Sequence, residues 1–276
     1  MKLIDFDGLF DEKLTQYMEE NKNKYTEKQW EDIIPKLYKK FGDTYVSKVK
    51  CTPKEYYARM SGEELTSVLA EHLKEDVPVP EFLCAEIENR GEAKTLLPLL
   101  QGEDTQSAIY AINLLGDDPL AFEEYFSILT DNRFDEDVRS DITDIFKFHA
   151  DAVKEKAFAA LQKGVATEYM LEILSRIKQK DDAVFDVLLQ AFLTSDDVSM
   201  KSSYLAAYGD ERALPHLYKR IEDRSIGFVE FQELKYAIEA LGGEYDEARD
   251  FSEDKDYIAV EEASAKAASA ANKTRS

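Results

Sequence analysis

The chain has 276 residues, of which 57 are acidic and 35 are basic, so its formal net charge is −22. This charge argues against nucleic acid and anionic membranes as partners, because both would be repelled, while a hydrophobic share of 44% is enough to bury a core. No apolar run approaches the roughly 18 residues that cross a membrane, and the acidic start lacks a signal-peptide stretch, so we expect a soluble cytoplasmic protein.

Residues 1–77 are predicted to form an N-terminal helical module. Apolar residues recur there at intervals of three and four, which is the periodicity of amphipathic helices. Thr52 before Pro53 and Ser61 before Glu64 have the residue types of helix N-caps. The proline-rich connector Val77-Pro-Val-Pro80 ends the module, because proline fixes an extended backbone. Helices are expected near 7–21, 27–41, 53–60, 62–75 and 80–89.

Residues 78–243 are predicted to form an α-solenoid built from helix pairs. Short Asp or Gly-Asp punctuation precedes helical stretches at Asp117, Asp151, Asp181 and Asp210, at intervals of 34, 30 and 29 residues. One helical hairpin cannot cover its own apolar face, so neighbouring hairpins must stack. An irregular helical bundle is the alternative. The five predicted units are 91–117, 118–150, 151–180, 181–209 and 210–243.

The last of these units resembles a known class of repeats. It runs from Gly209-Asp-Glu-Arg-Ala-Leu-Pro-His-Leu217 through a charged turn to a helix that ends at Ala240-Leu-Gly-Gly243. This pattern is similar to the short HEAT-like repeats of phycobilin lyases, and Asp137-Val-Arg139 resembles the start of the second helix of such a repeat. The resemblance implies an all-α solenoid, which in this class is commonly a protein-binding or regulatory scaffold.

Residues 244–276 are predicted to be an acidic, mobile tail. Residues 244–262 include nine acidic and two basic side chains. An alanine- and serine-rich stretch with few large apolar side chains follows. Such a composition does not repay the entropy of ordering. Carboxylates between Asp250 and Glu261 have part of the spacing of a calcium loop, but Lys255 stands where that loop needs glycine.

No residues with the spacing of a catalytic, cofactor or metal site are found. The histidines His72, His149 and His216 lie far apart, and Cys51 and Cys84 are not spaced as zinc ligands or as a redox pair. Phosphate-binding glycine motifs are also absent from the sequence. We therefore expect no enzyme activity, no cofactor and no metal.

Instead we expect a protein-binding scaffold, whose partner is a protein or peptide of basic character. The second helices of a HEAT-like stack line its concave face, and tyrosine there offers a large rigid surface at low entropic cost. A lyase or chaperone-type enzyme on the same scaffold and an acidic mimic of nucleic acid remain alternatives. The candidate partner-binding residues on this face are Tyr110, Asn113, Lys147, Arg176, Tyr204 and Tyr236.

Overall fold

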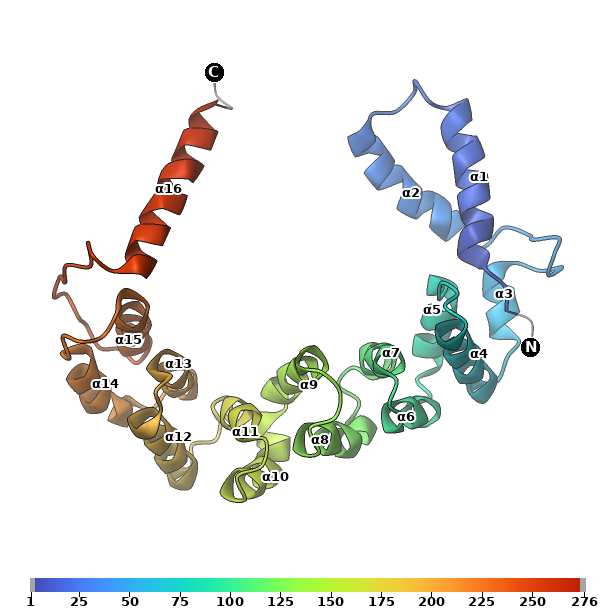
Figure 1. Cartoon of the computed structure of the whole chain (residues 1–276). Coiled ribbons are helices and arrows are strands. Elements are labelled where there is room, and N and C mark those ends of the chain that lie inside the picture. The colour runs from blue at the N-terminus through green and yellow to red at the C-terminus, as the bar shows by residue number, and fades with distance from the viewer. Residues whose placement is uncertain (1–2, 274–276) are drawn as a thin grey trace. The chain divides into compact units, whose positions relative to one another are not determined.

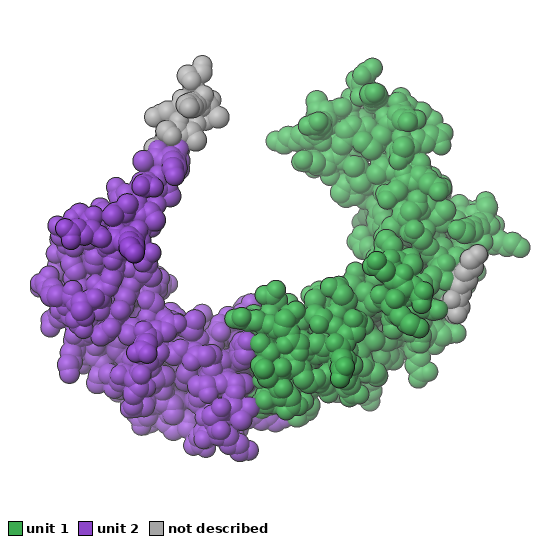
Figure 2. Space-filling model, in the orientation of Figure 1, with its two compact units in different colours: residues 1–142 green, residues 143–276 purple. Residues whose placement is uncertain are grey.

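The computed structural model describes residues 3–273, which divide into two compact units. Unit 1 comprises residues 1–142 and unit 2 comprises residues 143–276 (Figure 2). The predicted domain boundaries at 77 and 243 lie inside these units and stay predictions. No β-strand occurs between residues 3 and 273, where only an isolated bridge joins Val46 to Cys51. The predicted all-α fold is confirmed.

Unit 1 begins with helices of unequal length and continues with helix pairs (Figure 1). The boundary between the two units lies within helix α9 (Glu136–Phe148). The elements before it are α1 (Phe6–Glu20), α2 (Glu27–Phe41), α3 (Pro53–Ala58), α4 (Gly62–Lys74), α5 (Glu81–Arg90), α6 (Ala93–Gln101), α7 (Thr105–Leu115), the 3-10 turn η1 (Pro119–Ala121) and α8 (Phe122–Thr130).

Unit 2 continues the pairs and ends in a long helix (Figure 1). Its elements are α10 (Ala150–Gln162), α11 (Thr167–Leu174), α12 (Asp182–Thr194), α13 (Val198–Tyr208), the 3-10 turn η2 (Glu211–Ala213), α14 (Leu214–Ile221), α15 (Phe228–Ala240) and α16 (Lys255–Lys273).

Side-chain caps start many of these helices, as the sequence indicates. The Thr52 hydroxyl accepts a hydrogen bond from Glu55 N and the Ser61 hydroxyl accepts one from Glu64 N, each at 3.2 Å, and both caps are reciprocal capping boxes. Asp181 and Asp210 cap the elements that follow them.

Asp151 differs from the prediction. It lies inside the first turn of α10 rather than before it, because the helix already begins at Ala150. Its carboxylate accepts hydrogen bonds from Lys178 N and Gln179 N, at 3.1 and 3.3 Å, after the end of α11. Asp151 therefore ties the two ends of one helix pair together, although its spacing resembles that of the capping aspartates.

Helices contact mainly their neighbours in the chain. In unit 2, α10 packs on α11, α12 on α13 and α14 on α15, while α13 also contacts α11 and α15. The first helices of these pairs lie on one side and the second helices on the other (Figure 1). Each helix buries one stripe; in α12 it consists of Val184, Phe185, Leu188 and Phe192. This order is consistent with a helical repeat arrangement.

The segment after α15 packs on α14 and α15, the last helix pair of unit 2. Tyr245 is buried against the Phe231 ring, with centroids 6.0 Å apart, and the Phe251 ring lies 5.1 Å from the same ring. Arg249 donates to the carbonyl oxygens of Ile221 and Asp223 at the end of α14. These contacts cover the last helix pair, whereas side chains from Ile258 to Ala267 are exposed. The expected mobility of residues 244–276 stays a prediction.

Candidate binding site

A large hollow of unit 1 lies between α1, α2, α5 and α7. Its volume is about 910 Å³, within the range of ordinary ligand sites. Aromatic and aliphatic side chains form most of its wall, including Phe10, Pro35, Tyr38, Phe82 and Tyr110. Its ionisable lining residues are Asp7, Lys39, Lys54, Glu81 and Cys84. We call this hollow the α1–α7 cavity.

Tyr38 organises the wall of the α1–α7 cavity. Its ring stacks on Phe82 with 4.6 Å between centroids and 7° between planes, and the Phe10 ring meets it edge-on at 5.0 Å. The Tyr38 hydroxyl donates a 2.6 Å hydrogen bond to Asp7 Oδ1. Aromatic packing and one short hydrogen bond thus fix the Asp7 carboxylate relative to the rings.

The surroundings of Asp7 stabilise the negative charge of its carboxylate only in part. Burial raises its pKa, the hydrogen bond from Tyr38 lowers it, and the charges of Asp5 and Asp11 raise it further; nearby His72 opposes this shift. Burial, followed by the bond to Asp7, raises the pKa of Tyr38. The pKa of Asp7 lies above its ordinary value of 3.8, which means that its charged form costs free energy at this place.

Cys84 adds a thiol to the same wall. Burial, and then the charge of Glu88, raises its pKa to about 11. The thiol is therefore protonated at neutral pH and lacks the thiolate character that reactive cysteines need. Its contribution to the α1–α7 cavity is that of a small apolar side chain.

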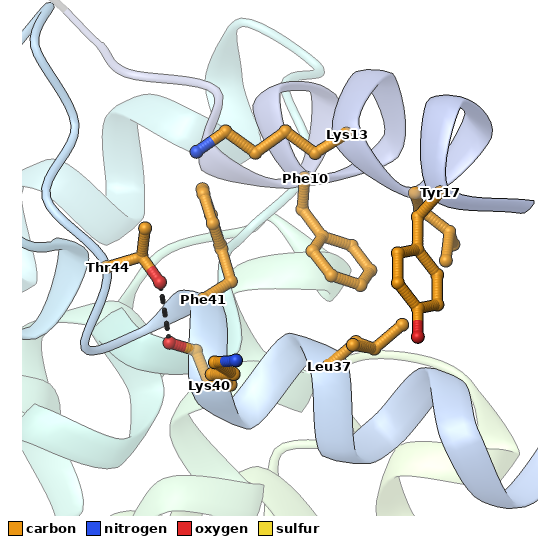
Figure 3. A pocket seen from close by; sticks show the side chains of 8 residues that line it. Phe10, Lys13, Tyr17, Leu37, Lys40, Phe41 and Thr44 are labelled. Carbon is orange, nitrogen blue, oxygen red and sulfur yellow. Dashed lines mark hydrogen bonds between the residues drawn. The ribbon is translucent and has the colours of Figure 1, made fainter. Parts of the chain in front are cut away.

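A smaller hollow of about 170 Å³ lies between α1 and α2 and shares Phe10 with the α1–α7 cavity. Figure 3 shows Phe10, Tyr17, Leu37 and Phe41 around it. The Lys13 ammonium group lies 5.1 Å from the centre of the Phe41 ring. A cation on an aromatic face is therefore already part of this helical hairpin.

Two buried polar atoms near Asp7 have no hydrogen-bond partner among the described residues. They are Tyr57 Oη and His72 Nε2. His72 lines a hollow of about 260 Å³ that shares Val79 and Tyr110 with the α1–α7 cavity. His72 Nδ1 is 3.4 Å from the Val77 carbonyl oxygen, so a proton on Nδ1 can be donated to this oxygen.

The acidic charge is concentrated beside these hollows. Residues 61–142 contain 20 acidic and 5 basic side chains, a net charge of −15, whereas residues 1–60 contain 11 acidic and 12 basic ones. Glu63, Glu64 and Glu71 line a further hollow of about 530 Å³ on α4, with no basic residue in its lining. Acidic side chains therefore outnumber basic ones by 15 in this part of unit 1.

The predicted partner-binding residues fall into the two units. In unit 1, Tyr110 lines the α1–α7 cavity, and Asn113 is exposed on the same helix. In unit 2, Lys147 binds Asp144 and Glu172, with Nζ–O distances of 2.5 and 2.7 Å, and Tyr204 is buried. Lys147 and Tyr204 therefore make internal contacts. Arg176 and Tyr236 are exposed, and a partner-binding role for all six stays a prediction.

Sequence reasoning missed the residues that build the α1–α7 cavity. Tyr38 has the spacing of a core residue on α2, and Phe82 and Cys84 lie in a short apolar stretch that also indicates core. Asp7 is one of several acidic residues near the start of the chain. Only the packing of α2 against α1 and α5 brings these residues together, and no local pattern marks them.

Within residues 3–273, no group of three or more His, Cys, Asp or Glu side chains is placed to hold a metal ion. No helix in the described part of the chain combines the length and apolar character that a membrane crossing requires.

Comparison with known proteins does not assign the chain to a family: no family, no curated protein and no solved structure matches it.

Proposed function

We propose that this protein is a non-catalytic scaffold of HEAT-like helix pairs that binds a basic protein or peptide. The observation that carries the proposal is the α1–α7 cavity, a partly aromatic hollow beside a stretch with a net charge of −15. Apolar hollows accept anchoring side chains, and charge complementarity speeds association and selects the partner.

The HEAT-like assignment of residues 91–243 is part of this proposal. It is supported by the sequential pairing of helices and by the capping aspartates Asp181 and Asp210. Arg139, in the segment that resembles the start of a second helix, donates to the carbonyl oxygens of Asn132 and Phe134. It therefore braces the turn that precedes its own helix.

The test uses two labelled dodecapeptides and fluorescence anisotropy. One has the repeat Arg-Leu-Lys-Ser, and the other has glutamate in place of each basic residue. We expect saturable binding of the basic peptide only, weakening about tenfold when salt is raised from about 50 to about 300 mM. Equal binding of both peptides, or binding of neither, would overturn the proposal.

A matched pair of variants locates the site. Ala85 lines the α1–α7 cavity, so Ala85→Phe places a ring into it; we expect this change to weaken basic-peptide binding about tenfold. Ala263 is exposed on α16, and Ala263→Phe serves as the control with unchanged affinity. Circular dichroism of both variants verifies that the helices persist. Equal affinity of the two variants would place the binding site elsewhere.

A further inference from the structure

Among the described residues, the Asp7 carboxylate accepts a single hydrogen bond in the α1–α7 cavity. Asp7 Oδ1 accepts from the Tyr38 hydroxyl, but among the described residues no donor reaches Asp7 Oδ2. Glu81 adds a second carboxylate to the lining. Close to the cavity, the buried ring nitrogen His72 Nε2 has no hydrogen-bond partner among the described residues. A group that fits this site must bring several donors.

The chain's own cations do not fill this role. Lys54 lines the α1–α7 cavity, but its ammonium group is held by both carboxylate oxygens of Asp43, at 2.8 and 2.9 Å. Lys39 is exposed at the cavity, and no ion pair joins it to Asp7 among the described residues. Asp5 and Asp11 increase the local negative charge. Among the described residues Asp7 has no ion-pair partner, and of the charges near it only that of His72 lowers its pKa. An external cation can therefore pair with Asp7.

The walls select the shape of that cation. The stacked rings of Tyr38 and Phe82 are nearly parallel, and Phe10 and Tyr110 also line the hollow. A guanidinium group is planar, stacks on aromatic faces and offers five donors in a fixed fork, whereas an ammonium group is compact and more strongly hydrated. An arginine side chain thus matches both the rings and the unpaired carboxylate oxygen.

We infer that the α1–α7 cavity binds an arginine side chain of the partner, with the guanidinium group on Asp7 and against the aromatic wall. The inference rests on the proposed function, because it names the anchoring side chain of the basic partner. It adds that the ion pair between the guanidinium group and Asp7, which has a defined geometry, determines where the partner docks, rather than diffuse charge attraction.

The experiment uses the full chain with ¹³C-labelled tyrosine rings and three small probes. These are the N-acetyl, N′-methylamide derivatives of arginine, of its neutral isostere citrulline and of lysine. We expect saturable shifts of the Tyr38 and Tyr110 ring signals with the arginine probe, at least about tenfold weaker apparent affinity for citrulline, and an intermediate affinity for lysine.

Asp7→Asn removes the charge but keeps an oxygen that can accept from Tyr38. We expect it to reduce the affinity for the arginine probe about tenfold and to abolish the preference over citrulline. The matched control is Asp186→Asn, because Asp186 is exposed on α12 in unit 2; it should leave the titration unchanged. The spectrum of each variant without probe, compared with that of the wild type, verifies that its tyrosine rings remain packed.

The outcomes separate this inference from the proposed function. Equal affinity for arginine and citrulline, or an Asp7→Asn titration like that of the wild type, overturns the arginine site. Equal affinity for lysine overturns the selectivity for a guanidinium group. If the basic dodecapeptide binds normally to Asp7→Asn, the scaffold proposal stands without this anchor; if it binds to no form of the chain, the scaffold proposal itself fails.

Discussion

Unit 1 and unit 2 use their acidic side chains in different ways. In unit 2, carboxylates form ion pairs that join successive helices: Lys154 binds Asp181 at 2.8 Å, and Arg212 binds both Asp182 and Asp210 at 2.8 and 2.7 Å. In unit 1, residues 61–142 have four times as many acidic as basic side chains. Unit 1 also has internal ion pairs, such as Arg133 with Glu124 at 2.8 Å, but its acidic side chains in residues 61–142 far outnumber the basic ones there.

The two units also differ in how their packing ends. Unit 2 closes with the aromatic segment around Phe251, which covers α15. Unit 1 contains the hairpin of α1 and α2, and two hollows there share Phe10 as a lining residue. A closed stack maximises burial, whereas an incompletely filled one provides space for another molecule. The proposed function uses the hollow of unit 1, whereas the hollow of about 400 Å³ in unit 2, between α12, α13 and α14, has no role in it.

The largest predicted effect comes from removing the aromatic cover of unit 2. A chain that ends at Gly243 loses Tyr245, Phe251 and Tyr257 and exposes Phe228 and Phe231. We expect it to lose about 4 kcal/mol of unfolding free energy or more, from the transfer free energy of these rings. A chain that ends at Tyr257 should unfold within about 0.5 kcal/mol of the full chain. Urea unfolding followed by circular dichroism measures both; equal midpoints would contradict the covering role.

A single contact within that cover is predicted to have the next largest effect. Arg249 donates to two backbone carbonyls, and its guanidinium group lies 4.8 Å from the Phe231 ring centre. Because charged hydrogen bonds contribute more than neutral ones, we expect Arg249→Ala to cost about 2–3 kcal/mol. Arg224→Ala at an exposed position is the control, with a change below about 0.5 kcal/mol in thermal unfolding. Similar losses of stability for both variants would show that the contacts of Arg249 do not stabilise the fold.

A smaller effect is expected from the buried Lys201 of α13. Its only carboxylate partner within the described residues is Glu168 of α11. Glu168→Gln leaves the buried ammonium group without a counter-charge and should cost about 1–2 kcal/mol, whereas Lys201→Met removes the charge itself and should cost less than about 0.5 kcal/mol. Chemical unfolding of both variants and of their combination measures this asymmetry. It is disproved if Lys201→Met is the more harmful change.

The smallest predicted effect is on the pH dependence of stability. It should have opposite signs for Asp7 in unit 1 and Asp210 in unit 2. The pKa of Asp7 is raised, first by burial, so its charged form opposes folding above the folded pKa, and this cost disappears as pH falls to the ordinary value of 3.8. We expect Asp7→Asn to be more stable than the wild type by up to about 1 kcal/mol at pH 7, with the difference closing on acidification.

Asp210 provides the opposite case in unit 2. Hydrogen bonds from Arg212 lower its pKa, so its charged form stabilises the fold, and this contribution is lost as pH falls through the folded pKa. Asp210→Asn should therefore be less stable at pH 7, and its deficit should close on acidification. Thermal unfolding across this pH range compares both variants. A pH-independent difference for Asp7→Asn would show that its charge costs nothing in the folded state.

Much of the fold follows from local patterns. The expected helices 27–41 and 62–75 correspond to Glu27–Phe41 and Gly62–Lys74, and the predicted units 181–209 and 210–243 contain the pairs α12–α13 and α14–α15. These elements have strong caps and clear periodicity, so neighbouring residues suffice to predict them. Asp151 shows the limit, since its spacing resembles that of the capping aspartates while its partners are Lys178 N and Gln179 N.

The candidate site was much less predictable. Tyr110 was identified because it is a tyrosine on an expected second helix, and the structure places it in the wall of the α1–α7 cavity. Tyr204 met the same criterion but is buried. Whether a tyrosine faces solvent or a neighbouring helix depends on the rotation of its helix against the next pair, and that rotation has no local signal.

By itself, the sequence determined the helical class, the positions and caps of most helices, and the excess of acidic charge, because each depends on residues close together in the chain or on composition alone. Only the tertiary structure decided that Asp7 meets Tyr38, that a hollow opens between α1, α2, α5 and α7, and that an acidic tail covers α15 with its aromatic rings. These features arise where segments distant in sequence pack together. Side-chain shape and burial set such contacts, and neither is encoded in a local pattern.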